Sequence, residues 1–263
     1  MFEPPPHYAD RPSRRGGTGT IVSVTAAVVV VAVVVGLGSS GVSRAVRSVL
    51  GLGEQPLASV PLLPAGDGSF AFLATQPGKS NVPVTYSPCD PIEVVVNPDD
   101  APSGYSGLVE TAMAHVTEES GLQFELVGET DERPSAERPG EDPARYGNGW
   151  SPVLVAWADS DEVPALAGDV AGLGGSMSVT QFGWARYVTG TVTLDEDSFA
   201  RLRSQPDGRA KSQAIVDHEF GHLVGLAHVD DTGELMSSDN AGKLSWGPGD
   251  RAGLSRLGRG RCP

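Results

Sequence analysis

The chain contains one stretch that reads H-E-x-x-H-x-x-G-x-x-H, with His218, Glu219, His222, Gly225 and His228 at its defined positions. On an α-helix, residues four apart lie on the same face, so the first two histidines can share one metal ion. Gly225 can take a positive φ, end the helix and turn the chain back, which brings His228 to the same ion. Three protein nitrogens with a fourth position left for water are typical of a catalytic zinc site.

Glu219 follows the first histidine directly, so its carboxylate can reach a water molecule at the metal and act as general base. The alternative interpretation is an amphipathic core helix that happens to carry structural histidines. Three of the five histidines of the chain lie in this one motif. This clustering favours a Zn2+ site over a core helix.

A methionine downstream of the motif is the second informative residue. Met236, in the stretch Glu234–Ser238, lies eight residues after His228. At these residues the chain resembles the metzincin clan of zinc endopeptidases, in which a Met-turn lies beneath the metal-binding histidines. Astacins and serralysins carry a zinc-binding tyrosine two residues after this methionine, whereas this chain has Ser238. The resemblance is therefore to the matrixin-like branch.

The residues next to the histidines leave two points open. Val229, Asp230 and Asp231 stand where matrixins usually begin with serine, so the subfamily is not assigned. Asp217, Asp230 and Asp231 flank the expected ligands, and each either orients a ligand histidine or is an ordinary surface acid.

The resemblance implies an α+β fold over residues 89–263. The expected architecture is a metzincin-like catalytic domain with a twisted mixed sheet of about five strands, an active-site helix, a Met-turn and a C-terminal helix. Local sequence patterns predict the same elements. Strands are expected at 92–96, 124–127, 153–157, 172–180 and 187–194, and helices at 103–119, 212–224 and 250–257.

Several smaller features of this domain carry expectations of their own. Ser212 is the predicted N-cap of the motif helix. His115 is predicted to be a partly buried structural residue, and the charged stretch 129–150 to be a solvated loop. Leu244 and Trp246 lie in the region expected to form the wall of a substrate pocket.

The stretch 172–180 is expected to be the edge strand of the sheet. The resemblance implies that this strand holds an extended substrate by β-augmentation, with Gly174, Gly175 and Ser176 in contact with it. Glycines there would let a peptide backbone come close. The alternative is a plain loop without a role in substrate binding.

The formal net charge of −14 argues against nucleic acid as a partner. Two cysteines, Cys89 and Cys262, bracket the expected domain, and in an oxidising compartment they would form one disulfide. The alternative is a cysteine switch in which Cys89 binds the zinc. The residues around Cys89 match that motif poorly, so the disulfide is favoured.

The N-terminal third of the chain has a different composition. Residues 1–20 are rich in proline, glycine and arginine and are predicted to be disordered. Residues 21–37 are uncharged and dominated by valine, and the segment 21–40 approaches the length that spans a bilayer. It is either a transmembrane signal anchor or a long signal peptide cleaved near Ser43–Ala45. Residues 41–88, with six prolines, are predicted to be a Pro/Gly-rich linker.

Together these features predict a secreted or membrane-tethered zinc endopeptidase that acts on protein or peptide substrates outside the cell membrane. Both interpretations of residues 21–40 export the rest of the chain, in agreement with the cysteine pair. The alternative is a non-catalytic zinc-binding scaffold of the same fold at the cell envelope. Glu219 favours the enzyme, because a binding scaffold needs no general base.

Overall fold

The computed structural model describes residues 55–62, 67–239 and 242–262, and the chain from Gln55 onwards forms one compact unit. The expected disordered segment 1–20, the expected membrane segment 21–40 and residues 41–54 lie outside the described residues. Within those residues no helix is long and apolar enough to cross a membrane.

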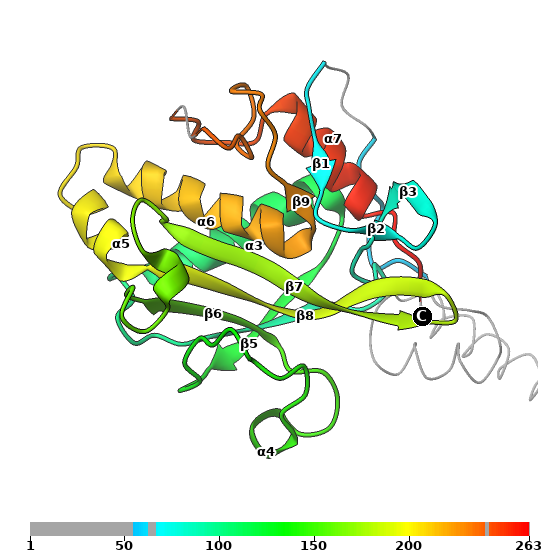
Figure 1. The fold of residues 1–263 in the computed structure, drawn as a ribbon, viewed down its shortest axis with the longest axis horizontal. Helices are drawn as coiled ribbons and strands as arrows, with labels where there is room; N and C mark the ends of the chain where they lie inside the picture. The colour runs from blue at the N-terminus through cyan, green and yellow to red at the C-terminus, as the bar shows by residue number, and fades with distance from the viewer. Residues whose placement is uncertain (1–54, 63–66, 240–241, 263) are drawn as a thin grey trace, which may run out of the picture. The chain divides into compact units, whose positions relative to one another are not determined.

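The centre of the domain is a mixed sheet of five strands (Figure 1). Its order is β5-β4-β6-β8-β7, with parallel pairing except between β7 and β8, which are antiparallel. The strands are β4 (Ile92–Val96), β5 (Phe124–Glu129), β6 (Val153–Ala158), β7 (Gly172–Gln181) and β8 (Trp184–Asp195). The five-stranded mixed sheet is thus confirmed, and β7 is the expected edge strand.

Central strands are buried on both faces and therefore read as continuous apolar runs. β6 is such a strand, because every one of its residues is buried. β4 has a β-branched run, of which Val94, Val95 and Val96 are all buried. The edge strand β7 is rich in glycine and serine, and none of its residues is fully buried.

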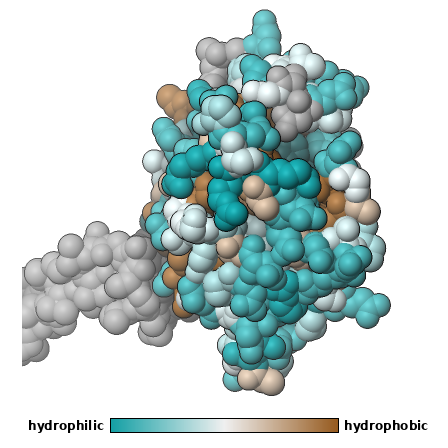
Figure 2. Space-filling view, turned by 90° about the vertical axis from the view of Figure 1, so that its left-hand side faces the viewer, coloured by the Kyte–Doolittle hydropathy of each residue, from teal (hydrophilic) through white to brown (hydrophobic). Residues whose placement is uncertain are grey.

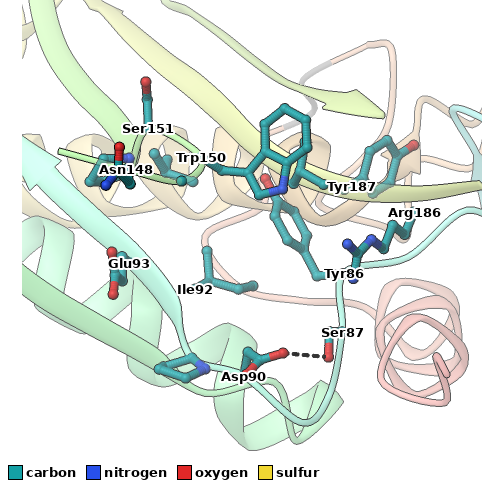
Figure 3. Close-up of a pocket in the computed structure, with 15 residues that line it drawn as sticks. Tyr86, Ser87, Asp90, Ile92, Glu93, Asn148, Trp150, Ser151, Arg186 and Tyr187 are labelled. Carbon is teal, nitrogen blue, oxygen red and sulfur yellow. Dashed lines mark hydrogen bonds between the residues drawn. The ribbon is translucent and has the colours of Figure 1, made fainter. Parts of the chain in front are cut away.

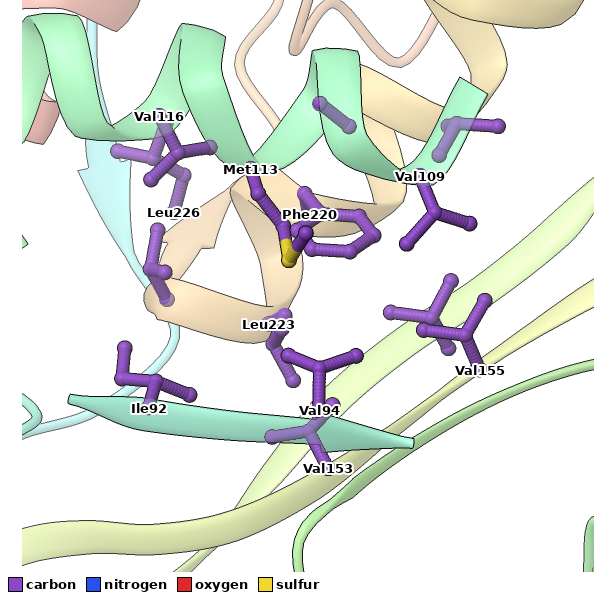
Figure 4. Close-up of a cluster of buried hydrophobic side chains, with 14 of the residues drawn as sticks. Ile92, Val94, Val109, Met113, Val116, Val153, Val155, Phe220, Leu223 and Leu226 are labelled. Carbon is purple, nitrogen blue, oxygen red and sulfur yellow. The ribbon is translucent and has the colours of Figure 1, made fainter. Parts of the chain in front are cut away.

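Helices α3 (Tyr105–Ser120) and α6 (Gly208–Val224) cover one face of the sheet (Figure 1). The main core lies between them and the sheet, where Val94 and Val155 meet Met113 of α3 and Phe220 and Leu223 of α6 (Figure 4). Helix α7 (Pro248–Leu257) packs against α3 and is the expected C-terminal helix. Short helices α4 (Pro143–Tyr146), α5 (Glu196–Leu202) and η1 (Pro164–Leu166) lie in connections.

The motif helix begins earlier than predicted. Asp207 is its N-cap residue and Gly208 its first residue, whereas Ser212 is buried one turn inside the helix. A Cβ at position 208 would lie 1.8 Å from the Leu202 carbonyl oxygen. The tight turn from α5 into α6 therefore requires glycine there, and this packing rather than a polar cap sets the start of the helix.

The expected linker 41–88 is corrected in its described part, because residues from 67 onwards belong to the domain. β1 (Ala71–Phe72) pairs with β9 (Leu226–Ala227), and β2 (Thr75–Gln76) pairs with β3 (Lys79–Pro83). The side chain of Gln76 is buried and bonds both backbone groups of Ala185 in β8, at 2.7 and 2.9 Å. One amide side chain thus replaces a strand partner at this point.

The charged stretch 129–150 is also more than a solvated loop. Arg138 is almost completely buried and makes a two-pronged ion pair with Glu132. The same guanidinium donates to the carbonyl oxygens of Gly190 and Pro152 and to the Thr189 hydroxyl. Because a buried guanidinium needs all its donors paired, Arg138 fixes this loop on β8 and on the start of β6.

Cys89 and Cys262 form a disulfide, as expected, with their Cα atoms 5.4 Å apart. The bond joins the residue that precedes β4 to the residues that follow α7. The disulfide therefore links the two ends of the catalytic core covalently.

Candidate active site

Helix α6 places the first two histidines of the motif on one face, and its C-terminus brings in the third. Gly225 ends the helix with φ +120°, and its N–H bonds the carbonyl oxygens of Gly221 and His222. β9 then runs back past the helix to His228. The Nε2 atom of His228 lies 3.0 Å from that of His218 and 3.1 Å from that of His222.

The tautomers of two histidines follow from their other ring nitrogen. Nδ1 of His218 lies 2.8 Å from the Leu235 carbonyl oxygen, and Nδ1 of His222 lies 2.8 Å from the Leu226 carbonyl oxygen. A carbonyl oxygen can only accept, so both Nδ1 atoms carry the proton and both Nε2 atoms present a lone pair. Burial, as the largest cause, lowers the pKa of His218 to about 4 and also lowers the pKa of His222.

Three nitrogen atoms with potential ligand lone pairs thus meet at one point, all within 4.8 Å of one another. Lone pairs at this separation repel unless a cation lies between them. A Zn–N distance of about 2.0–2.1 Å suits such a set of imidazoles, and neutral imidazole is the form that binds metal. The residues present therefore fit a zinc ion.

Glu219 lies beside the histidines and points towards the cleft. Its side chain is 6% exposed, and Oε2 is buried without a hydrogen-bond partner among the described residues. Burial raises the pKa of Glu219 to about 8, while a backbone hydrogen bond from Gly174 lowers it. A buried carboxylate oxygen without a partner is costly, so its position indicates a role with a bound molecule.

Met236 packs against Gly221 of α6, the residue that precedes His222. It is buried, and a Cβ on Gly221 of α6 would come within 2.7 Å of its sulfur. The turn that carries it is held by Asp250 of α7, which accepts from the N–H of Leu235 at 2.6 Å and of Met236 at 3.3 Å. Asp250 therefore acts on His218 through the Leu235 peptide. The sequence prediction does not include this role, although Asp250 is an acid in the first turn of the last helix.

Among the described residues, none of the three aspartates next to the histidines hydrogen-bonds a ligand ring. Asp217 instead pairs with His115 of α3 at 2.9 Å and with Gln213. His115 is half-buried and structural, as predicted, and it joins α3 to α6. Main-chain carbonyls rather than carboxylates thus orient His218 and His222.

A cleft of about 580 Å³ contains the three histidines and Glu219. Its apolar lining includes Ala214, Ile215 and Leu235. Ser237 and Ser238 also line it, whereas Leu244 and Trp246 do not. Leu73, next to β1, lines the cleft as well and is half exposed. The sequence contained no signal for Leu73, because β1 is two residues long.

The edge strand lies along the same cleft through Gly172, Leu173 and Gly174. A Cβ on Gly174 would lie 2.1 Å from the backbone oxygen of Glu219, so this glycine allows close approach of α6 to the sheet. The Ser176 hydroxyl donates to the Leu223 carbonyl oxygen at 2.7 Å and also contacts the Tyr86 hydroxyl. Gly175, the remaining predicted contact residue, is in open space: a Cβ added there would meet no atom within 4 Å.

A second cavity, of about 400 Å³, contains none of the three histidines (Figure 3). Its wall includes Tyr86, Trp150 and Arg186 together with the carboxylates Asp90 and Glu93. Among the described residues, no cluster of three or more potential metal ligands lies there. The chemistry of the motif is therefore confined to the first cleft.

Comparison with known protein families finds a match to one part of the chain. Residues 165–255 match the profile of the matrixin family. The segment that carries the site is thus similar to matrixin zinc metallopeptidase domains. The matched segment contains the edge strand, the three histidines, Met236 and most of α7, and together with the histidine triad it identifies Zn2+ as the cofactor.

The chain is also similar to solved structures, at low sequence identity. No curated protein matches the chain. Archaemetzincin from Methanopyrus kandleri is 19% identical, with 63% of this chain and 93% of that chain covered and a TM-score of 0.39. A structure described as the GM1-bound form of the ECX AB5 holotoxin is 14% identical, with 65% and 81% covered and a TM-score of 0.39.

Proposed function

We propose that the domain is an endopeptidase that works outside the cytoplasm, with His218, His222 and His228 as zinc ligands and Glu219 as general base. The observation that carries this proposal is the convergence of three Nε2 atoms beside the unpartnered Oε2 of Glu219. Bound zinc supplies a Lewis acid that polarises a carbonyl group and lowers the pKa of water.

The role of Glu219 follows from its place in the cleft. Burial raises its pKa to about 8. A cation held by the neighbouring histidines would lower that pKa, so that the carboxylate would be ionised at neutral pH. Its Oε2 then takes a proton from the attacking water molecule. The same oxygen gives this proton to the nitrogen of the cleaved peptide bond, and Glu219 returns to its starting form.

The substrate is proposed to be an extended peptide that lies along β7. This strand pairs with β8 on one side and has no strand partner on its other side among the described residues. Its free backbone groups can therefore add a strand of substrate. The apolar wall of Ala214, Ile215 and Leu235 would take an apolar side chain on one side of the cleaved bond, and Leu73 would contact the other side.

The proposed location rests on two features of the chain. The disulfide between Cys89 and Cys262 suits an oxidising compartment. The uncharged segment 21–37 follows arginines, which favours export with a cytoplasmic N-terminus and either a retained anchor or a cleaved signal. We therefore propose a secreted enzyme or one tethered through residues 21–40.

The test is cleavage of an unfolded protein by the zinc-loaded chain and by its Glu219→Gln variant. Loss of the base should lower kcat roughly 10²–10⁴-fold, while the zinc content stays at one ion per chain. Chelation should abolish cleavage by the parent, and added zinc should restore it. A Glu219→Gln variant as active as the parent would instead favour the non-catalytic zinc scaffold with a contaminating peptidase.

A further inference from the structure

The tip of the β7–β8 hairpin carries a residue that neither the turn nor the core requires. Phe182 and Gly183 form the turn with φ values of +51° and +76°. Glycine tolerates this left-handed region, and asparagine is common at the first position of such turns, but a bulky aromatic residue is an outlier there. The side chain of Phe182 is also 99% exposed. Strain and exposure together point to a bound partner.

Cations lie next to this tip. The Trp184 ring, two residues further on, contacts the Arg261 guanidinium at 3.9 Å and the Lys79 ammonium at 5.1 Å. Both cations are exposed, and neither has a carboxylate within ion-pair distance in the part of the chain that the structure describes. Arg186 lies on the same strand (Figure 3). A basic, aromatic end is unusual on a chain whose net charge is −14.

The N-terminal part of the domain reaches this same end. The Leu57 N–H bonds the Pro88 carbonyl oxygen at 2.8 Å. Gly260, next to Arg261, packs against Pro88 and Thr85, and Thr85 pairs with Arg186 of β8. The chain that precedes Gln55, which includes the apolar segment 21–37, is therefore attached to the domain at this end.

The opposite end of the domain has a different surface. Figure 2 shows the side on which α5 lies, and that face is mostly hydrophilic. Aromatic rings flanked by lysine and arginine are typical of protein segments that lie in the interface of a membrane. The charge and the position of the chain entry therefore favour a lipid surface over a protein as the partner of Phe182.

We propose that Phe182, Trp184, Lys79 and Arg261, here called the docking tip, bind the surface of an anionic lipid membrane. Phe182 enters the boundary between headgroups and acyl chains, and the two cations lie at the lipid phosphates. The proposal rests on the proposed location at a membrane. β7 runs from the cleft at Gly174 towards the tip at Phe182, so docking would hold the active site up to about 27 Å from the headgroups, at about 3.4 Å per residue.

The experiment uses the full chain with Phe182→Trp and vesicles whose lipids carry brominated acyl chains, which quench tryptophan at short range. The control is Leu126→Trp, which lies exposed on β5 at the opposite edge of the sheet. In vesicles with 30% phosphatidylglycerol, the quenching that Phe182→Trp adds to that of the parent chain should be at least twice the quenching that Leu126→Trp adds. In pure phosphatidylcholine the difference should fall by half or more, and Lys79→Gln with Arg261→Gln should produce the same fall.

A second variant separates docking from folding. Phe182→Asn suits the turn, so it should keep or raise the melting temperature, yet it should remove the protection of amides 179–185 from hydrogen exchange on anionic vesicles. Flotation of the same samples with the vesicles measures whether the chain is anchored through residues 21–40, the proposed tether. A chain that floats with vesicles while Phe182→Trp is quenched no more than Leu126→Trp overturns the docking tip and leaves the tether intact. Quenching of a chain that does not float stably upholds the tip without the tether.

Discussion

At the scale of single residues, the chemistry of the site depends on which atoms face each other. The spacing of the motif was enough to predict that His218, His222 and His228 converge, because helical geometry relates residue spacing to a shared face. It could not predict that the carbonyl oxygens of Leu235 and Leu226 fix two of the rings. Main-chain groups are the same at every position, so they leave no sequence signal.

Gly174 has a packing role that the sequence did not predict. The prediction concerned approach of the substrate, and the structure shows in addition that this glycine allows close approach of α6. Gly174→Ala would place Cβ 2.1 Å from the Glu219 backbone oxygen, so we expect it to lower the free energy of unfolding by about 1–3 kcal/mol. Gly175→Ala meets open space and should change stability by less than about 0.5 kcal/mol. Urea unfolding of both variants measures this, and equal effects would contradict the packing argument.

Asp250 makes the stability of the Met-turn depend on pH. Burial raises its pKa from 3.8 to about 6, so the folded state binds its proton more tightly than the unfolded state. The contribution of Asp250 to stability is therefore greatest below pH 4 and decreases as the pH rises to about 6, by up to about 3 kcal/mol.

The comparison that isolates this effect is between the parent and Asp250→Asn, which cannot titrate at this position. The difference in the free energy of unfolding, parent minus variant, should become smaller between pH 4 and pH 6. Urea unfolding at half-unit pH intervals measures it. A difference that grows with pH over this range would mean that the folded-state pKa is depressed rather than raised.

At the scale of elements, predictability followed the strength of the local pattern. The buried strands, α3, α6 and α7 were predicted because they are long enough to show a period. β1 and β2 were missed because two-residue strands have no period, and β3, which has five residues, was missed because the prolines around it suggested a linker. Their position is set by tertiary contacts, above all the bonds of Gln76 to Ala185, which no local pattern encodes.

The missed element β1 has a predicted consequence for substrate choice. The Leu73 N–H bonds the Gly225 carbonyl oxygen at 2.9 Å, which holds its half-exposed side chain at the cleft. Leu73→Ala should lower kcat/KM roughly tenfold for peptides with an apolar residue in contact with it, because lost apolar contact in a pocket is worth about 1–3 kcal/mol.

Leu126→Ala, a similar truncation on β5 away from the cleft, is the matched control and should leave kcat/KM unchanged. Cleavage of a peptide library by the three proteins measures both effects. Zinc content should be the same in all of them. A uniform loss across the library would show that Leu73 positions the site rather than contacts the substrate.

At the scale of the whole molecule, the cysteine count and the position of the two cysteines predicted the disulfide correctly. The extent of the domain was predicted less well, because residues 67–88 wrap around it. They contact the catalytic core at β9 and β8, and a Cβ on Gly68 would lie 2.1 Å from the backbone nitrogen of Gly249 in α7. Composition marks such a segment as a linker, since it has few residues that could form a core by themselves.

The disulfide is expected to stabilise the folded domain without acting on the site. Cys89 and Cys262 are separated by 173 residues, and closing so long a loop lowers the entropy of the unfolded chain, which is worth up to about 5 kcal/mol. Cys89→Ser with Cys262→Ser should therefore lower the free energy of unfolding by about 2–5 kcal/mol.

The zinc ligands come from α6 and from the residue that follows β9, so the folded fraction of this variant at low temperature should keep one zinc ion per chain and its kcat. Urea unfolding with and without reductant measures the effect: reductant should destabilise the parent as the double substitution does and leave the variant unchanged. Loss of zinc from the folded variant would instead mean that the clamp at the chain ends also shapes the active site through α7.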